Sequence, residues 1–316
     1  MTAEALAAAD HGPADLTPAD LAAADEAGLR AALAAGVTVR ALSSIDELTA
    51  VIGLFDEIWA PEDGNSLMHV DLLRAMTKAG NYASGAFDLG SGKLIGACVG
   101  FFGPPTHAEL HSHIAGVVPA GLGRSVGFAL KLHQRAWALR RCVAVIAWTF
   151  DPLICRNAYF NLAKLGARPT EYLPNFYGAM DDAINGGTET DRMLVRWELR
   201  SNLAGAARAP KPPAVSADEE RRRGAVVALS AGPDGRPVTA PPSAGQPGPR
   251  TVLVGVPADV ETMRMTDPDG AAQWRSALRK VLAPLLAGGA RVTGFDQSGW
   301  YVVSLERGGS NEAGRD

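Results

Sequence analysis

Four ionisable side chains alternate along one short segment of the chain, at His107, Glu109, His111 and His113. Successive side chains of a β-strand point to opposite faces of the sheet, so these four would share one face. Ionisable groups in a row do not belong in a dry core, where each would need a partner, and we expect this face to line a cleft or to meet solvent. A neutral histidine there could take a proton from a nucleophile at neutral pH.

The same residue types allow a second interpretation, in which the strand holds a metal ion. Histidine and glutamate are ligands that zinc and iron(II) accept. Alternate residues along one strand are spaced by about 6.6 Å, however, so more than two adjacent ones rarely converge on one ion. The spacing therefore favours acid–base chemistry over metal binding.

The segment that follows is suited to holding a phosphate. Residues 109–118 are expected to form a strand and 119–123 a turn, and from Arg124 onward apolar positions recur at helical spacing. The first N–H groups of a helix have no acceptor within the helix, and the helix dipole adds partial positive charge there. This layout predicts an anion site at the start of the helix.

The remaining elements would place this segment inside a mixed α/β domain. Ser44 and Glu47 form a capping-box pattern that opens a helix, and Ser66 is expected to cap a second helix that ends near Gly80. The apolar run 143–150 is typical of a strand buried on both faces. Further strands are predicted at 37–42, 82–89, 93–102, 170–180 and 192–199, and helices at 45–59, 66–78 and 157–165.

Composition and charge exclude several classes of protein. The chain has 316 residues, of which 47% are hydrophobic and 20% charged, as expected of a globular domain with an additional part. A net charge of −4 and a pI near 5.9 argue against a general binder of nucleic acid or membrane surfaces. Neither a membrane span nor a signal peptide is recognisable. The three cysteines lack zinc-site spacing, so reduced thiols and a cytoplasmic location are expected.

We expect five parts along the chain. Residues 1–36 would be an N-terminal arm, either a frayed helix or disordered, followed by the main domain at 37–200. A linker rich in Pro and Ala would span 201–249, with one short strand at 225–229. Residues 250–307 would form a β-α-β-β module and 308–316 a tail. Four elements are too few to bury a core alone, so the module is expected to pack on the main domain, or on a second subunit in a homodimer.

The order of elements resembles the GNAT superfamily of acyl-CoA-dependent N-acyltransferases. In that family the pyrophosphate turn reads R/Q-x-x-G-x-G/A at the start of a helix, after a strand ending near V-x-P. Here V-V-P precedes L-G-R-S-V-G, so Leu122 replaces the Arg or Gln, Ser125 replaces the first Gly, and Gly127 matches. The resemblance implies an α/β GNAT fold, with a mixed central β-sheet flanked by helices and a C-terminal β-α-β-β module. The CoA-binding residues that it implies are Val117, Leu122, Gly123, Arg124, Ser125, Val126, Gly127, Asn157 and Tyr159.

The histidines have their own counterpart in the family. Aralkylamine N-acetyltransferases place H-x-H on the strand before the pyrophosphate turn, so the resemblance implies His111 and His113, with Glu109, as catalytic residues. The tyrosine that protonates the departing CoA thiolate in many members falls at Leu162, which leaves the general acid unassigned. The stretches LHSHIAG, TFDPL, NAYFNLAKLGA and EYLPNFYG resemble a bacterial group of predicted acetyltransferases, some of which occur beside enzymes of amino-acid racemisation.

These features predict an N-acyltransferase that moves an acetyl or succinyl group from CoA to a small-molecule amine such as an amino acid. The cofactor would be acetyl-CoA or another acyl-CoA, succinyl-CoA included, and neither a metal, a nucleic acid nor a membrane is expected. Two alternatives remain open. One is a non-catalytic acyl-CoA-binding or sensor protein, because the tyrosine and the first glycine are replaced; the other is a metal-dependent enzyme that uses the His/Glu strand.

Overall fold

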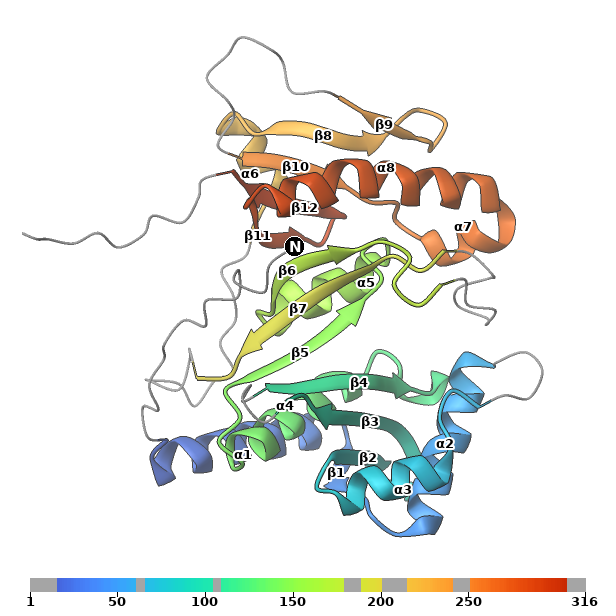
Figure 1. The fold of residues 1–316 in the computed structure, drawn as a ribbon, viewed down its shortest axis with the longest axis vertical. Coiled ribbons are helices and arrows are strands. Elements are labelled where there is room, and N and C mark those ends of the chain that lie inside the picture. Colours follow the sequence, from blue (N-terminus) through green and yellow to red (C-terminus); the bar gives the residue numbers. More distant parts are fainter. Residues whose placement is uncertain are drawn as a thin grey trace, which may run out of the picture.

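The computed structural model describes residues 16–60, 66–104, 109–178, 189–200, 215–240 and 251–305, which form two β-sheets with helices packed on both (Figure 1). In space the strands of the first sheet run in the order β1-β2-β3-β4-β5-β7-β6. Its strands are β1 (Val37–Ala41), β2 (Tyr82–Asp88), β3 (Leu94–Phe102), β4 (Glu109–Val117), β5 (Val145–Phe150), β6 (Arg168–Leu173) and β7 (Arg192–Glu198).

Helices cover both faces of the first sheet. Gly96 and Gly116 lie beside each other with opposite orientations, because a β-carbon at Gly96 would meet α4 and one at Gly116 would meet α2. On the α4 face, α1 packs across α4 through a strip of alanine and glycine that allows close approach. The helices are α1 (Pro18–Ala34), α2 (Ile45–Trp59), α3 (Val70–Lys78), α4 (Val126–Leu139) and α5 (Cys155–Ala158), with short helical segments η2 (Pro119–Gly121) and η3 (Tyr159–Lys164).

Local sequence signals were accurate at one helix and wrong at the next. The capping box at Ser44 and Glu47 is present, and α2 begins directly after it. Ser66 does not cap α3, which begins four residues later behind His69 without a side-chain cap. The Ser66 hydroxyl donates instead to Asp56 of α2, at 2.7 Å. The described part of the N-terminal arm is also helical, since α1 is capped by Thr17 and packs on α4.

The C-terminal part forms a second sheet, drawn in orange and red in Figure 1, with strand order β11-β12-β10-β8-β9. Two of these strands come from the segment predicted as linker: β8 corresponds to the short strand predicted at 225–229, whereas β9 and the helix α6 were not predicted. β8 is short and pairs in parallel with β10, a long-range contact that local periodicity does not reveal. The elements are α6 (Ala217–Arg222), β8 (Val226–Ala231), β9 (Pro237–Thr239), β10 (Thr251–Gly255), α7 (Val260–Thr266), α8 (Pro268–Ala287), β11 (Arg291–Asp296) and β12 (Trp300–Ser304).

The C-terminal module packs on the first sheet's domain. Val254, Trp274 and Leu278 are buried in a core that also contains residues of β5, β7 and η3. α8 lies against β6, and β11 against β6 and η3. Among the described helices, none is both long and apolar enough to span a membrane.

Candidate functional site

β4 and β5, the only parallel pair among the described strands of the first sheet, run together for three residues and then separate (Figure 1). The last paired residues are His111 and Ala147, which we call the apex. Beyond the apex β4 continues beside β3 and β5 beside β7. One extra residue on β4, opposite the step from Val99 to Gly100, makes a β-bulge just past the apex. The backbone groups that face each other across the opening therefore have no strand partner.

A cavity of about 220 Å³ occupies this opening. Both separated strands, α4 and the segment from α5 to η3 contribute to its wall. The lining residues are Ser112, His113, Ala115, Gly116, Val117, Gly127, Leu130, Lys131, Trp148, Thr149, Phe150, Asn157, Phe160 and Asn161. Of the residues predicted from sequence, only His113, Val117, Gly127 and Asn157 are in this set.

The first turn of α4 opens on this cavity. Gly123 and Ser125 have left-handed backbone conformations, with φ of 77° and 64°. The Ser125 carbonyl accepts the N–H groups of Phe128 and Ala129, while its hydroxyl caps nothing. The N–H groups of Val126 and Gly127 have no acceptor one turn earlier and are therefore available to a ligand. Uncapped donors beside a residue without a side chain fit the pyrophosphate of CoA.

Arg124 does not contribute to this turn. Its guanidinium donates to the carbonyl oxygens of Ala35 and Gly36, both at 3.1 Å, and forms an ion pair with Asp88 at 2.7 Å. These contacts tie the end of α1 to β2. The predicted phosphate contact is therefore replaced by a structural role, and the neighbouring Leu122 is exposed away from the cavity.

His111 and His113 lie near each other at the apex, with ring centroids 6.3 Å apart. Both rings contact Phe101 of β3, at centroid distances of 5.0 and 5.7 Å. Burial lowers the pKa of His111 to about 4, helped by the positive charges of His113 and Lys131, and burial also lowers the pKa of His113. Both imidazoles are therefore neutral at neutral pH, and His111 remains neutral well below the ordinary histidine range.

Glu109 is engaged elsewhere. Its carboxylate forms an ion pair with Arg196 of β7, at the closed end of the β4–β5 pair. His107 lies outside the described residues. Among the residues that the structure describes, no three His, Cys, Asp or Glu side chains are placed to hold a metal ion.

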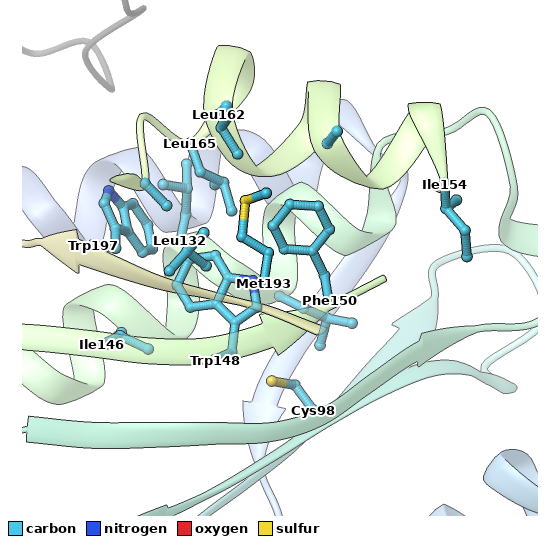
Figure 2. Packing of buried hydrophobic residues seen from close by; sticks show 14 of the residues in the cluster. Cys98, Leu132, Ile146, Trp148, Phe150, Ile154, Leu162, Leu165, Met193 and Trp197 are labelled. Atoms are coloured by element: carbon cyan, nitrogen blue, oxygen red, sulfur yellow. The ribbon is translucent and has the colours of Figure 1, made fainter. Parts of the chain in front are cut away.

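The segment after β5 forms the far wall of the cavity. Asn157 lines the cavity and is not a helix cap, since α5 begins behind Ile154. Tyr159 does not reach the cavity; its ring lies 5.9 Å from the Lys164 ammonium. Leu162, the position at which the resemblance implies a tyrosine, packs with Leu165 above β5 in the core (Figure 2).

Lys131 is the functional candidate that the sequence did not indicate. Its side chain is only 5% exposed, because it lies against β4 and β5 on the sheet side of α4. Its Nζ donates to Ser112 Oγ at 2.7 Å and to Gln134 Oε1 at 3.3 Å. It also lies 4.0 Å from the ring centroid of Trp148. Helical periodicity alone cannot distinguish such a lysine from a solvated one.

The C-terminal module holds the turn that joins β5 to α5. Buried Asp151 accepts hydrogen bonds from Arg264 of α7 at 2.5 Å and Arg275 of α8 at 3.0 Å. The Tyr301 hydroxyl of β12 donates to the Pro152 carbonyl at 2.7 Å. These contacts fix the chain between Phe150 and Asn157, both of which line the cavity.

Comparison with known proteins adds structural similarity only. No family model and no curated protein matches the chain. Solved structures do match: the ribosomal-protein-S18-alanine N-acetyltransferase of Escherichia coli is 13% identical, with a TM-score of 0.41 over 52% of this chain and 94% of its own. The ribosomal-protein-S5-alanine acetyltransferase of Vibrio fischeri is 13% identical, with a TM-score of 0.43 over 52% and 94%. A proposed acetyltransferase of Salmonella typhimurium, solved with acetyl-CoA, is 15% identical, with a TM-score of 0.41 over 55% and 99%.

The fold expected from the sequence is confirmed by the arrangement of the strands themselves. A mixed sheet is flanked by helices, one parallel pair separates beyond the apex, and a glycine turn leads from that opening into a helix. This part of the chain therefore has the mixed α/β architecture that the resemblance implies, a central sheet flanked by helices.

Proposed function

We propose that the protein is an acyl-CoA-dependent N-acyltransferase that carries an acetyl or succinyl group to a small-molecule amine such as an amino acid. One observation carries this proposal: a single cavity reaches from Gly127, at the uncapped start of α4, to Ser112 and His113 at the apex of the separated strands. An anion site at one end and proton acceptors at the other are what transfer from a phosphorylated thioester to an amine requires.

The chain's own groups would hold the donor along this path. A bound acyl-CoA would supply a thioester, which is an activated acyl group. The N–H groups of Val126 and Gly127 would bind its pyrophosphate, and the unpaired edges of β4 and β5 would bind its amide groups as an added strand does. Asn157 would offer both a donor and an acceptor from the opposite wall.

The amine would approach from the face that carries His111 and Phe101, opposite α4. An amine that bonds to an acyl carbon must lose a proton, and a neutral imidazole can accept it directly or through water. The lowered pKa values of His111 and His113 keep both rings unprotonated at neutral pH. Glu109 would act on the reaction only through its neighbours, because Arg196 holds its carboxylate.

One observation favours a second candidate, a non-catalytic acyl-CoA-binding protein. No tyrosine is among the described residues that line the cavity, and Leu162 is buried in the core. Such a protein would bind acyl-CoA without consuming it. Measured turnover of acetyl-CoA or succinyl-CoA with a panel of small amines, amino acids included, separates the two candidates.

The cofactor assignment can be tested by replacing Gly127 with valine. A β-carbon at Gly127 would have its nearest neighbour, Val117 Cγ2, only at 4.0 Å, so the change is tolerated by the fold but fills the space above the phosphate donors. We expect acetyl-CoA affinity, measured by calorimetry, to fall roughly tenfold or more, as for the loss of one hydrogen bond to a charged group.

Gly53→Val is the matched control. Gly53 is also helical, but it lies on the exposed side of α2 with nothing within 4 Å of an added β-carbon. Its affinity for acetyl-CoA should equal that of the wild type. A folded Gly127→Val protein that binds acetyl-CoA as tightly as this control would contradict the proposed cofactor site.

A further inference from the structure

Lys131 is a buried ammonium group without a counter-ion in the described part of the chain. Its contacts are a hydroxyl, an amide oxygen and an aromatic ring, from Ser112, Gln134 and Trp148. A buried charge raises the free energy of the fold unless it is paired. The geometry therefore suits a negative charge that arrives with a ligand.

The position of Lys131 indicates which part of a ligand it would meet. Ser112 and Trp148, its hydrogen-bond and ring partners, are the first residues of β4 and β5 beyond the apex. Trp148 is itself fixed, since its indole N–H donates to Asn161 Oδ1 at 3.2 Å. A thioester at the apex would have His111 on one face of the sheet and the Lys131 ammonium on the α4 face.

We infer that Lys131 is the proton donor to the sulfur of the leaving group, an inference that rests on the proposed N-acyltransferase function. As the amine nitrogen bonds to the acyl carbon, the carbon–sulfur bond breaks and its electron pair stays on sulfur. Lys131 gives one ammonium proton to that sulfur, which leaves as the thiol of CoA. The proton lost by the amine passes toward His111 and His113, and solvent returns a proton to Lys131 before the next turnover.

The acidity of Lys131 suits this role. Burial lowers its pKa to about 8, close to the value of about 8.5 for an ordinary thiol, so proton transfer to a thiolate is nearly balanced. The titratable groups facing it are Cys98 of β3 and His111 of β4. Burial raises the pKa of the Cys98 thiol, so at neutral pH neither neighbour brings a negative charge.

The test compares the binding of CoA with that of desulfo-CoA, which lacks the thiol. Both ligands share the pyrophosphate, so they share every contact with α4. We expect the wild type to prefer CoA by roughly tenfold, as for a hydrogen bond to a charged group, and Lys131→Met to lose this preference while keeping its affinity for desulfo-CoA. The ultraviolet absorbance of the thiolate should also show that CoA bound to the wild type ionises at lower pH than free CoA.

Turnover gives a second readout. Lys131→Met should lower kcat by about 10²-fold or more with little change in KM for acyl-CoA. Lys131→Arg should lower kcat by a similar factor, because a guanidinium keeps its charge but holds its proton too tightly to donate it. Lys280→Met, at an exposed position of α8, is the matched control and should behave as the wild type.

The outcomes separate this inference from the proposed function. If the wild type binds neither CoA nor desulfo-CoA, the proposed function fails. If it binds both equally at every pH, or if Lys131→Met keeps wild-type turnover, the role of Lys131 is overturned while the acyltransferase proposal stands. Should Lys131→Met not fold, the ligand comparison and the thiol ionisation in the wild type decide alone.

Discussion

Replacing Lys131 with methionine should stabilise the fold at neutral pH, because methionine keeps the length of the side chain without its charge. The pKa of Lys131 falls from an ordinary 10.5 to about 8 in the folded protein. A tenfold change in proton affinity corresponds to about 1.4 kcal/mol, so burying this charge costs about 3 kcal/mol. The lost hydrogen bond to Ser112 offsets about 1 kcal/mol of the gain. We therefore expect the free energy of unfolding to rise by about 2 kcal/mol at pH 7.

The pH dependence identifies the cause. Because the folded pKa is lower than the unfolded one, the unfolded chain binds more protons between about pH 8 and pH 10.5, and wild-type stability contributed by this group rises across that window. The advantage of Lys131→Met should therefore be complete below about pH 8 and should fall as the pH rises toward 10.5, where the variant becomes slightly less stable than the wild type because only the lost hydrogen bond to Ser112 remains. A gain from better packing would not depend on pH.

Urea unfolding from about pH 6 to about pH 9.5 measures this difference. Groups that titrate alike in both proteins cancel in the comparison. Lys280→Met should change the unfolding free energy by no more than about 0.5 kcal/mol at any pH, as expected of an exposed site. If Lys131→Met is less stable than the wild type at pH 7, or if its increase in the free energy of unfolding is the same at both ends of the pH range, the buried charge does not destabilise the fold as we infer.

Two further predictions concern the apex and the turn behind it. The double change His111→Gln/His113→Gln should lower kcat/KM about 10²-fold or more with CoA affinity unchanged. In the wild type, the acidic limb of the pH profile of kcat/KM, corrected for ionisation of the amine, should lie near pH 4 rather than 6.5. Wild-type turnover in the double variant would remove both histidines from the mechanism. Asp151→Asn should destabilise the fold by about 3–5 kcal/mol in urea unfolding, because it removes the carboxylate that forms ion pairs with the buried Arg192, Arg264 and Arg275. Asp218→Asn, at an exposed ion pair, should be nearly neutral, and equal stability of the two variants would contradict this account of the turn.

Sequence reasoning succeeded where the signal is local. The capping box of α2 and the strand–turn–helix that begins with β4 depend on residues close together in the sequence, and both form as expected. The alternation of Glu109 and His111 correctly placed them on one face, but their partners come from β7 and β3, which the alternation does not specify. The lowered pKa of His111, about 4, could not be predicted either, since burial depends on the whole fold.

The failures share a cause, which is contact between distant parts of the chain. Arg124 is held by carbonyl groups at the end of α1 and by Asp88, so its position at the head of α4 gave no clue to its partners. Lys131 is buried because β4 and β5, which contribute Ser112 and Trp148, lie against its face of α4. β9 is a strand because β8 lies beside it, although its own segment has the composition of a linker. None of these contacts produces a hydrophobic periodicity or a recognisable motif in the sequence.

The C-terminal module contributes to the candidate site through one short piece of backbone. α5 continues directly into η3, and this helical segment has no side-chain cap and is too short to be stable by itself, yet it positions Asn157 on the cavity wall. The turn before it is held by arginines of α7 and α8 on Asp151 and by the Tyr301 hydroxyl on Pro152. A two-arginine clamp on one buried carboxylate orients the chain in a way that apolar packing alone would not, because charge-assisted hydrogen bonds are directional. The wall of the cavity opposite α4 therefore depends on a module that lies outside the first sheet.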